Sequence, residues 1–243
     1  MGAALGWGLL AGSSVLLGGW LALRVPISTR VLGLIMGFGS GVLISAVAYE
    51  LVAEASSTAD RGWAVALGLS AGCATFFVGD VLVDRMGGAD RKSAAGGQAA
   101  GSGLAIVLGI VLDGIPESVV IGVGLLEGVG VSAAMLVAVF LSNLPEAIAA
   151  TSGLVKSGWE RSRITGLWVA VTVVSGLSSL AGYAFLENAP GDTIAFVLAF
   201  AGGAILTMLA DTMMPEAFEH GGPLVGVFTT LGFALAFAIS ALE

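Results

Sequence analysis

Charged residues are scarce in this chain of 243 residues, at 11% against 57% hydrophobic residues. An ordinary soluble domain has about 25% charged and about 45–50% apolar residues. The composition therefore excludes a soluble globular protein and a disordered one. It also argues against a β-barrel, whose lumen-facing positions would alternate polar with apolar. Glycine is common in membrane helices, and the 38 glycines here fit an all-α membrane protein.

Cysteine and histidine are nearly missing, because the chain has only Cys73 and His220. One cysteine excludes an intrachain disulfide framework. One histidine excludes a His-rich metal cage. His220 lies near the inner end with Glu216 and Glu219, and we expect it in a solvated loop, with a weak exit ligand as the alternative. The net charge of −8 disfavours nucleic acid as a partner.

Eight stretches are long enough to cross a membrane as helices, which takes roughly 20 mostly apolar residues. They are predicted at 3–23, 31–53, 62–83, 103–125, 129–153, 164–186, 193–214 and 222–242. We therefore treat 1–243 as a single transmembrane domain in a lipid bilayer. Residues 84–102 are rich in Gly, Ala and Ser and are predicted to form a flexible cytoplasmic linker.

Basic residues indicate the orientation. Eight of the nine Lys and Arg residues fall in the connections after the first, third and fifth spans, and only Arg61 lies on the other side. Since positive residues stay cytoplasmic, both termini are expected outside. A plasma or inner membrane is the expected location.

Carboxylates, unlike the bases, fall inside the predicted spans. There are six of them: Glu50, Asp80, Asp113, Glu117, Glu146 and Asp211. A charge at the bilayer centre costs about 2.5–3.5 kcal/mol on insertion scales. No Lys or Arg falls at that depth, so the compensating partner must be a proton or a metal ion.

Two related motifs, at 113–117 and 142–146, carry three of these carboxylates. Asp113 and Glu117 are four residues apart and share a helix face, as do Ser142 and Glu146. Pro116 and Pro145 remove a helical hydrogen bond in each motif, which frees the carbonyls of Leu112 and Leu141 to face a cavity.

Fainter echoes of the motif occur in two other spans, which run in opposite directions. They are Asp211-Thr212-Met-Met-Pro-Glu216 and Glu50-Leu-Val-Ala-Glu54. Related motifs in opposite orientation are what an inverted-repeat transporter would carry.

These features together resemble the ZIP (Zrt- and Irt-like) family of divalent-metal transporters over nearly the whole chain. The stretches at 37–55 and 204–221 look like the second and seventh spans of that family. The resemblance implies an inverted repeat of spans 1–3 and 6–8 around spans 4 and 5. It also implies zinc, iron or manganese transported toward the cytoplasm as cargo, with no enzymatic activity and no resident cofactor.

The resemblance implies a metal-ligand set and further pathway positions. The ligands are Asp113, Glu117, Ser142, Asn143 and Glu146, and the pathway positions are Glu50, Ser179, Asp211, Thr212 and Glu216. This chain departs from the family, which usually has His-Asn at 113–114, often His at 142 and a carboxylate at 179. We therefore expect one competent metal site at most. An all-oxygen set suits harder ions, so zinc is expected within a broad divalent range and with weak discrimination.

Three alternatives stay open at this point. The chain is a degenerate family member that no longer transports, a proton-coupled carrier of another solute, or an intramembrane enzyme using Asp80 and Asp211. Gly33, Gly37 and Gly41, four residues apart, predict close helix packing, either inside the chain or at the seam of a homodimer.

Overall fold

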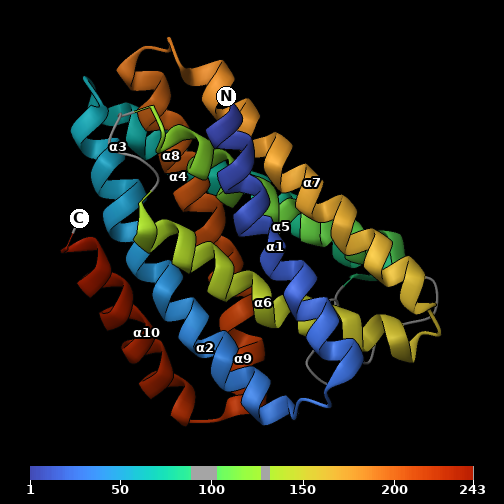
Figure 1. The fold of residues 1–243 in the computed structure, drawn as a ribbon. Helices are drawn as coiled ribbons and strands as arrows, with labels where there is room; N and C mark the ends of the chain where they lie inside the picture. Colours follow the sequence, from blue (N-terminus) through green and yellow to red (C-terminus); the bar gives the residue numbers. More distant parts are fainter. Residues whose placement is uncertain (89–102, 127–131, 243) are drawn as a thin grey trace.

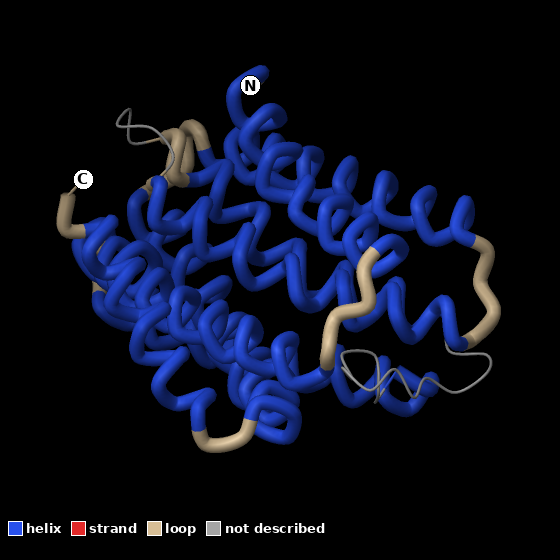
Figure 2. Tube along the Cα trace, turned by 60° about the horizontal axis from the view of Figure 1, so that its bottom comes forward, coloured by secondary structure: helices blue, strands red, loops and turns tan. Residues whose placement is uncertain are grey.

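The computed structural model describes residues 1–88, 103–126 and 132–242. Within these ranges all regular structure is helical (Figure 2). The helices form eight continuous rods, several of them built from consecutive segments. They are α1 (Gly2–Arg24); α2 (Thr29–Ala46) with η1 (Val47–Val52) and α3 (Ala53–Thr58); α4 (Gly62–Val83) with η2 (Asp84–Gly88); α5 (Gly103–Val123); α6 (Ala133–Lys156); α7 (Arg161–Leu186); α8 (Gly191–Met208) with η3 (Leu209–Met213) and α9 (Met214–Gly221); and α10 (Leu224–Ser240).

The predicted all-helical membrane class is confirmed. Six of the rods in the described residues are long and apolar enough to cross a membrane. Helix α10 is a shorter apolar helix of 17 residues, and α5 has 21 residues and carries Asp113 and Glu117. Each rod coincides with one of the eight predicted spans, and the differences lie at the ends.

The seventh span differs most from its prediction, at its C-terminal end, and this difference corrects the expectation for His220. This residue lies in helix α9 and not in a loop, because the rod that begins at Gly191 continues to Gly221. Pro215 follows the π-helical turn η3, which already departs from the regular α-helical hydrogen-bond pattern that a proline would break. Gly222, with φ of 66°, then ends the helix.

The predicted linker at 84–102 begins with ordered structure. Residues 84–88 extend α4 through a kink at Gly87, whose φ of 91° is not helical. The rest of the predicted linker lies outside the described residues.

The helices pack in a paired pattern (Figure 1). Helix α1 lies along α7, α2 along α10, and α4 along α8. Helix α6 packs against α1 and α2, while α5 packs against α7 and α8. The two helices with the proline motifs therefore each contact members of different pairs.

The glycine stripe of α2 serves packing within the chain, which answers one question that the sequence left open. Gly33 faces α9, and Gly37 faces Val225 at the start of α10. A Cβ at Gly41 would collide with the carbonyl of Thr229, so α2 and α10 approach at backbone distance.

Glycines also allow α4 and α8 to pack closely. A Cβ at Gly72 of α4 would collide with the carbonyl of Phe200, and one at Gly203 of α8 would collide with that of Leu69. Each partner thus contributes a glycine, so the two backbones come close together.

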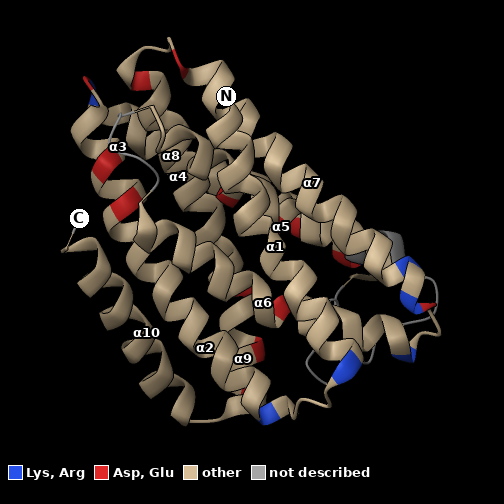
Figure 3. Ribbon diagram, in the orientation of Figure 1, with Lys and Arg blue, Asp and Glu red and all other residues tan. Residues whose placement is uncertain are grey.

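Charge is segregated along the bundle (Figure 3). Every Lys and Arg of the described residues is exposed and lies in or beside a helix end. Most of them gather where α1 meets α2 and where α6 meets α7, whereas red carboxylates also occur along the helices. That these basic ends face the cytoplasm stays a prediction.

Candidate metal-binding site

The two proline motifs are joined by a hydrogen bond between side chains. Asn143 of α6 donates from Nδ2 to Oε2 of Glu117 on α5, at 3.0 Å. Both helices keep their proline inside the helix, Pro116 in α5 and Pro145 in α6. The structure therefore brings the middle of one motif against the middle of the other.

The acidic side chains of these motifs are deeply buried. Asp113 is 3% exposed, Glu117 1% and Glu146 8%. Burial penalises the charged form of a carboxylate, so each anion needs a compensating proton, cation or hydrogen-bond donor. One donor is the Asn143 amide on Glu117.

The three buried carboxylates are not gathered to metal-binding distance. The compact set of potential ligand atoms in the described residues, all within 4.8 Å of one another, comprises Glu216, Glu219 and His220 instead. An ion shared by Asp113, Glu117 and Glu146 would require their side chains to rearrange.

The two serines of the motif region bond to their own helices. Ser142 is fully buried and donates to the carbonyl of Val139 at 3.1 Å. Ser118 donates to the carbonyl of Gly114 at 2.7 Å. The role of Ser142 as a metal ligand stays a prediction, since its hydroxyl oxygen could still offer a lone pair.

Pro145 has no N–H to donate to the carbonyl of Leu141, and this carbonyl faces helix α2. The carbonyl oxygen of Leu141, four residues before Pro145, lies 3.1 Å from where a Cβ of Gly39 would be. Helix α2 thus approaches α6 at the motif, and Gly39 is the residue that permits it.

Gly114 occupies the position where the family usually has asparagine. A Cβ built there would meet nothing within 4 Å. The space beside Asp113 that a second amide ligand would use is therefore open in this chain.

A cavity of about 100 Å³ lies at the C-terminal end of α5. Its polar wall includes Glu50 of η1 and Glu54 of α3. Its apolar wall includes Val120 and Ile121, the turn of α5 that follows Glu117. The predicted pathway residue Glu50 thus lines a cavity that is separated from Glu117 by about one turn of apolar side chains.

The other predicted pathway residues lie apart from this cavity. Ser179 of α7 is fully buried and donates to the carbonyl of Ala4 at 2.8 Å, which ties α7 to α1. Asp211 of η3 is exposed and lines a groove with Cys73 and Thr207. Thr212 donates to the carbonyl of Met208 at 2.7 Å.

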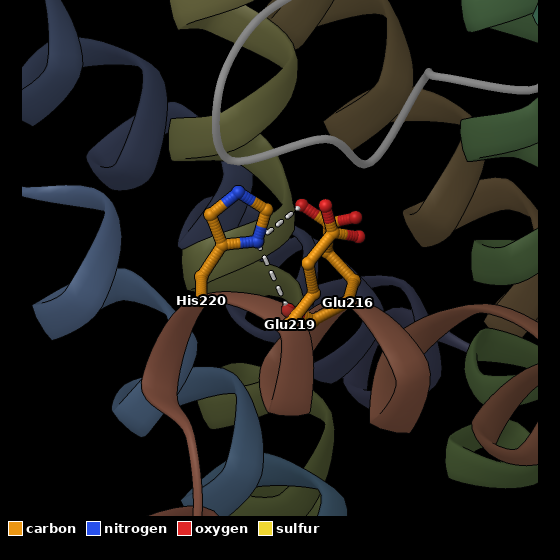
Figure 4. Close-up of side chains that lie close together, drawn as sticks. All are labelled: Glu216, Glu219 and His220. Carbon is orange, nitrogen blue, oxygen red and sulfur yellow. Dashed lines mark hydrogen bonds and ion pairs between the residues drawn. The ribbon is translucent and has the colours of Figure 1, made fainter.

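Among the predicted pathway positions, Glu216 lies beside two other potential metal ligands. His220 Nδ1 lies 3.1 Å from Glu216 Oε1, and Glu219 points to the same place (Figure 4). The sequence analysis placed Glu216 and Glu219 beside His220 near the inner end, but it expected His220 in a loop and did not include Glu219 among the pathway positions. Positions 216, 219 and 220 are three and four apart, so one face of a helix carries all three.

The fold defines a multi-pass helical membrane protein, and three carboxylates are buried inside its helical bundle. No family model matches the chain. A curated protein of Arabidopsis thaliana, named "Putative zinc transporter", is 26% identical over 227 residues, which is 90% of this chain. The chain spans about a third of that relative, 35% of its length. The similarity is distant, and it agrees with the resemblance to the ZIP family.

Proposed function

We propose that this protein is a divergent ZIP-family transporter that carries divalent metal ions, zinc with manganese or iron as alternatives, across the membrane toward the cytoplasm. The observation that carries the proposal is the bond from Asn143 to Glu117, which unites two proline motifs among buried carboxylates. The distant relative named as a zinc transporter and the multiple membrane spans support it.

Asp113, Glu117, Ser142, Asn143 and Glu146 form the proposed binding set. An entering dication would replace the compensating protons or donors of the buried carboxylates, so that Asp113 and Glu117 reach it from one face of α5. Glu146 would reach it from α6, with the Asn143 carbonyl oxygen as a further ligand once the amide turns. Such oxygen ligands accept zinc and also suit harder ions.

An inverted repeat is part of the proposal, and the helix pairs support it. Suppose that the rods at 2–24, 29–58 and 62–88 correspond to those at 161–186, 191–221 and 224–240. The α2–α10 pair then corresponds to the α8–α4 pair, and in both pairs glycines let the two helix backbones approach closely. The α1–α6 contact likewise corresponds to α7–α5. The π-helical turns η1 and η3 fall in corresponding rods, and each carries an acid, Glu50 or Asp211.

The proposed orientation in the membrane rests on the charge distribution, whereas transport toward the cytoplasm rests on the resemblance to the ZIP family. With the basic helix ends in the cytoplasm, both termini lie outside and the cavity beside Glu50 opens on the outer side. We place the protein in a plasma or inner membrane. A homodimer is compatible with this arrangement, although the α2 glycine stripe is already used inside the chain.

The test is uptake of Zn²⁺, Mn²⁺, Fe²⁺ and Mg²⁺ into proteoliposomes that hold the full chain or its Glu146→Gln variant. We expect uptake of the first three by the wild type and at least a tenfold loss in the variant. Glu187→Gln changes the same type of side chain at an exposed position and should transport like the wild type.

Two outcomes would contradict the proposal. Folded wild-type protein with no flux above empty vesicles would support a degenerate member that does not transport. Flux of another solute driven by a pH gradient without any metal would support a proton-coupled carrier.

A further inference from the structure

We infer that Glu216, Glu219 and His220 form a second metal site, which binds a divalent transition-metal ion such as Zn²⁺ independently of the buried set. The inference extends beyond the proposed function, because equilibrium binding at this site does not require transport. It rests on the proposed orientation only for its location, the cytoplasmic end of the bundle.

The donor atoms are already gathered. One ligand atom from each of the three side chains lies within 4.8 Å of the other two (Figure 4). His220 Nδ1 and Glu216 Oε1 are 3.1 Å apart. Two ligands of one tetrahedral zinc ion, each about 2.0–2.2 Å from the metal, lie about 3.3 Å from each other. His220 Nδ1 also lies 3.2 Å from the carbonyl oxygen of Glu216. A metal ion bound at Nδ1 would therefore displace the proton that this nitrogen shares with the two oxygens, and the side chains would need to move little.

The type and charge of the donors select a transition metal. The set combines one imidazole with two carboxylates, which is three protein ligands with a fourth position left for water. Imidazole favours zinc, copper, iron or nickel over magnesium and calcium. With neutral histidine the set carries two negative charges, so a dication would neutralise it.

The surroundings hold the set in place and leave it reachable. The side chains of His220 and Glu216 are only 13% and 15% exposed, while Glu219 is exposed. Backbone packing fixes the helix beneath them, since a Cβ at Gly33 of α2 would lie 2.6 Å from the Gly221 nitrogen. The ligands also occupy the last turns of a helical rod, where the helix dipole favours a cation.

The site depends on the helical conformation of α9, which carries all three ligands (Figure 4). All three side chains leave one face of α9 and converge on one side of it. Had the chain ended its helix at residue 214, as the sequence predicts, residues 216–220 would have no fixed spacing. The continuation of the rod past Pro215 to Gly221 creates the site.

The test uses the full chain in detergent with Co²⁺ as a spectroscopic probe and Zn²⁺ in competition with a chelating dye. The wild type should bind Co²⁺ with visible d–d bands, and Zn²⁺ should displace it. His220→Ala should remove the bands and weaken Zn²⁺ binding at this site at least tenfold, and Glu216→Gln should weaken it similarly. Glu160→Gln, an exposed acid at the start of α7, is the control and should leave both unchanged.

The double variant Asp113→Asn, Glu117→Gln separates this inference from the proposed function. We expect it to lose metal uptake and to keep the Co²⁺ bands. The inference is overturned if folded His220→Ala and His220→Gln both retain the bands and bind Zn²⁺ within twofold of the wild type. It is equally overturned if the double variant alone abolishes the bands. Absence of transport with the bands intact would refute the proposed function and leave this site standing.

Discussion

Two acidic sets in this protein differ in how their ligands are supplied. The set at α5 and α6 is buried, offers oxygen atoms only, and draws its carboxylates from two helices. The cluster on α9 is partly exposed, includes the histidine, and comes from one helix. Only the second is compact in the structure. Ligands on one helix have a spacing fixed by the helix, whereas ligands on two helices depend on how those helices sit. Ligands on two helices can separate and meet as the helices move, which suits the brief binding of cargo that we propose for the buried set.

The largest expected effect comes from neutralising the centre of the buried set. In Glu117→Gln the new side-chain carbonyl can still accept the hydrogen bond from Asn143, so the contact between α5 and α6 is kept and only the charge is lost. We expect zinc uptake by proteoliposomes to fall at least tenfold with little change in thermal unfolding. Normal uptake by this variant would remove the buried set from the transport pathway.

The next prediction concerns selectivity and separates the two sets by donor type. His220→Gln removes the imidazole from the α9 cluster and leaves the oxygen-only set intact. We expect Zn²⁺ affinity of the cluster to fall about tenfold and Mn²⁺ affinity to change less, because imidazole favours zinc over manganese. Competition binding with both ions measures the ratio. Equal losses for Zn²⁺ and Mn²⁺ would show that the histidine does not set the preference.

A smaller effect is expected when the bridge between the motif helices is removed. Asn143→Ala takes the amide donor from the buried Glu117 carboxylate. Losing a hydrogen bond to a buried charged group costs roughly 1.5–3 kcal/mol, so the midpoint of thermal unfolding should fall by several degrees. The control is Ser152→Ala, which removes from the same helix a hydroxyl bonded to the carbonyl of Ile148. Equal unfolding midpoints for the two variants would contradict a specific stabilising role of the Asn143–Glu117 hydrogen bond.

The smallest effect is expected at Ser142. Its hydroxyl already donates to the carbonyl of Val139 within α6, and the side chain is fully buried. Ser142→Ala should change zinc uptake by less than about threefold, since a neutral hydroxyl contributes less to binding a dication than a carboxylate does. Initial uptake rates measure this. A loss as large as that of Glu117→Gln would make the hydroxyl a principal ligand.

The membrane-spanning helices were largely predictable, because burial in lipid demands long apolar stretches whatever their partners. The fourth span was predicted at 103–125 despite Asp113 and Glu117, and α5 covers Gly103–Val123. The seventh was predicted to end at 214, whereas its rod reaches Gly221. Charged residues and a proline lower the apolar signal there, although Pro215 in the first turn of α9 does not interrupt the rod.

The residues of the buried candidate set could be named from the sequence, but their geometry could not. Spacing alone placed Asp113 and Glu117 on one face, yet the partner of Glu117 is Asn143, 26 residues further on. Likewise nothing in the local sequence distinguished internal packing from a dimer seam for the α2 glycines. The partner of Gly41 is Thr229 on α10, nearly the whole chain away.

By itself, the sequence determined that this chain lies in a membrane, crosses it repeatedly and carries acids where lipid offers no counter-charge, since these follow from hydropathy and charge residue by residue. The tertiary structure decided which acids have which neighbours. Helix packing joins Glu117 to Asn143 and leaves Asp211 exposed, and it holds the turn that carries His220 against Gly33. Such contacts depend on distances between distant segments, which local spacing does not encode.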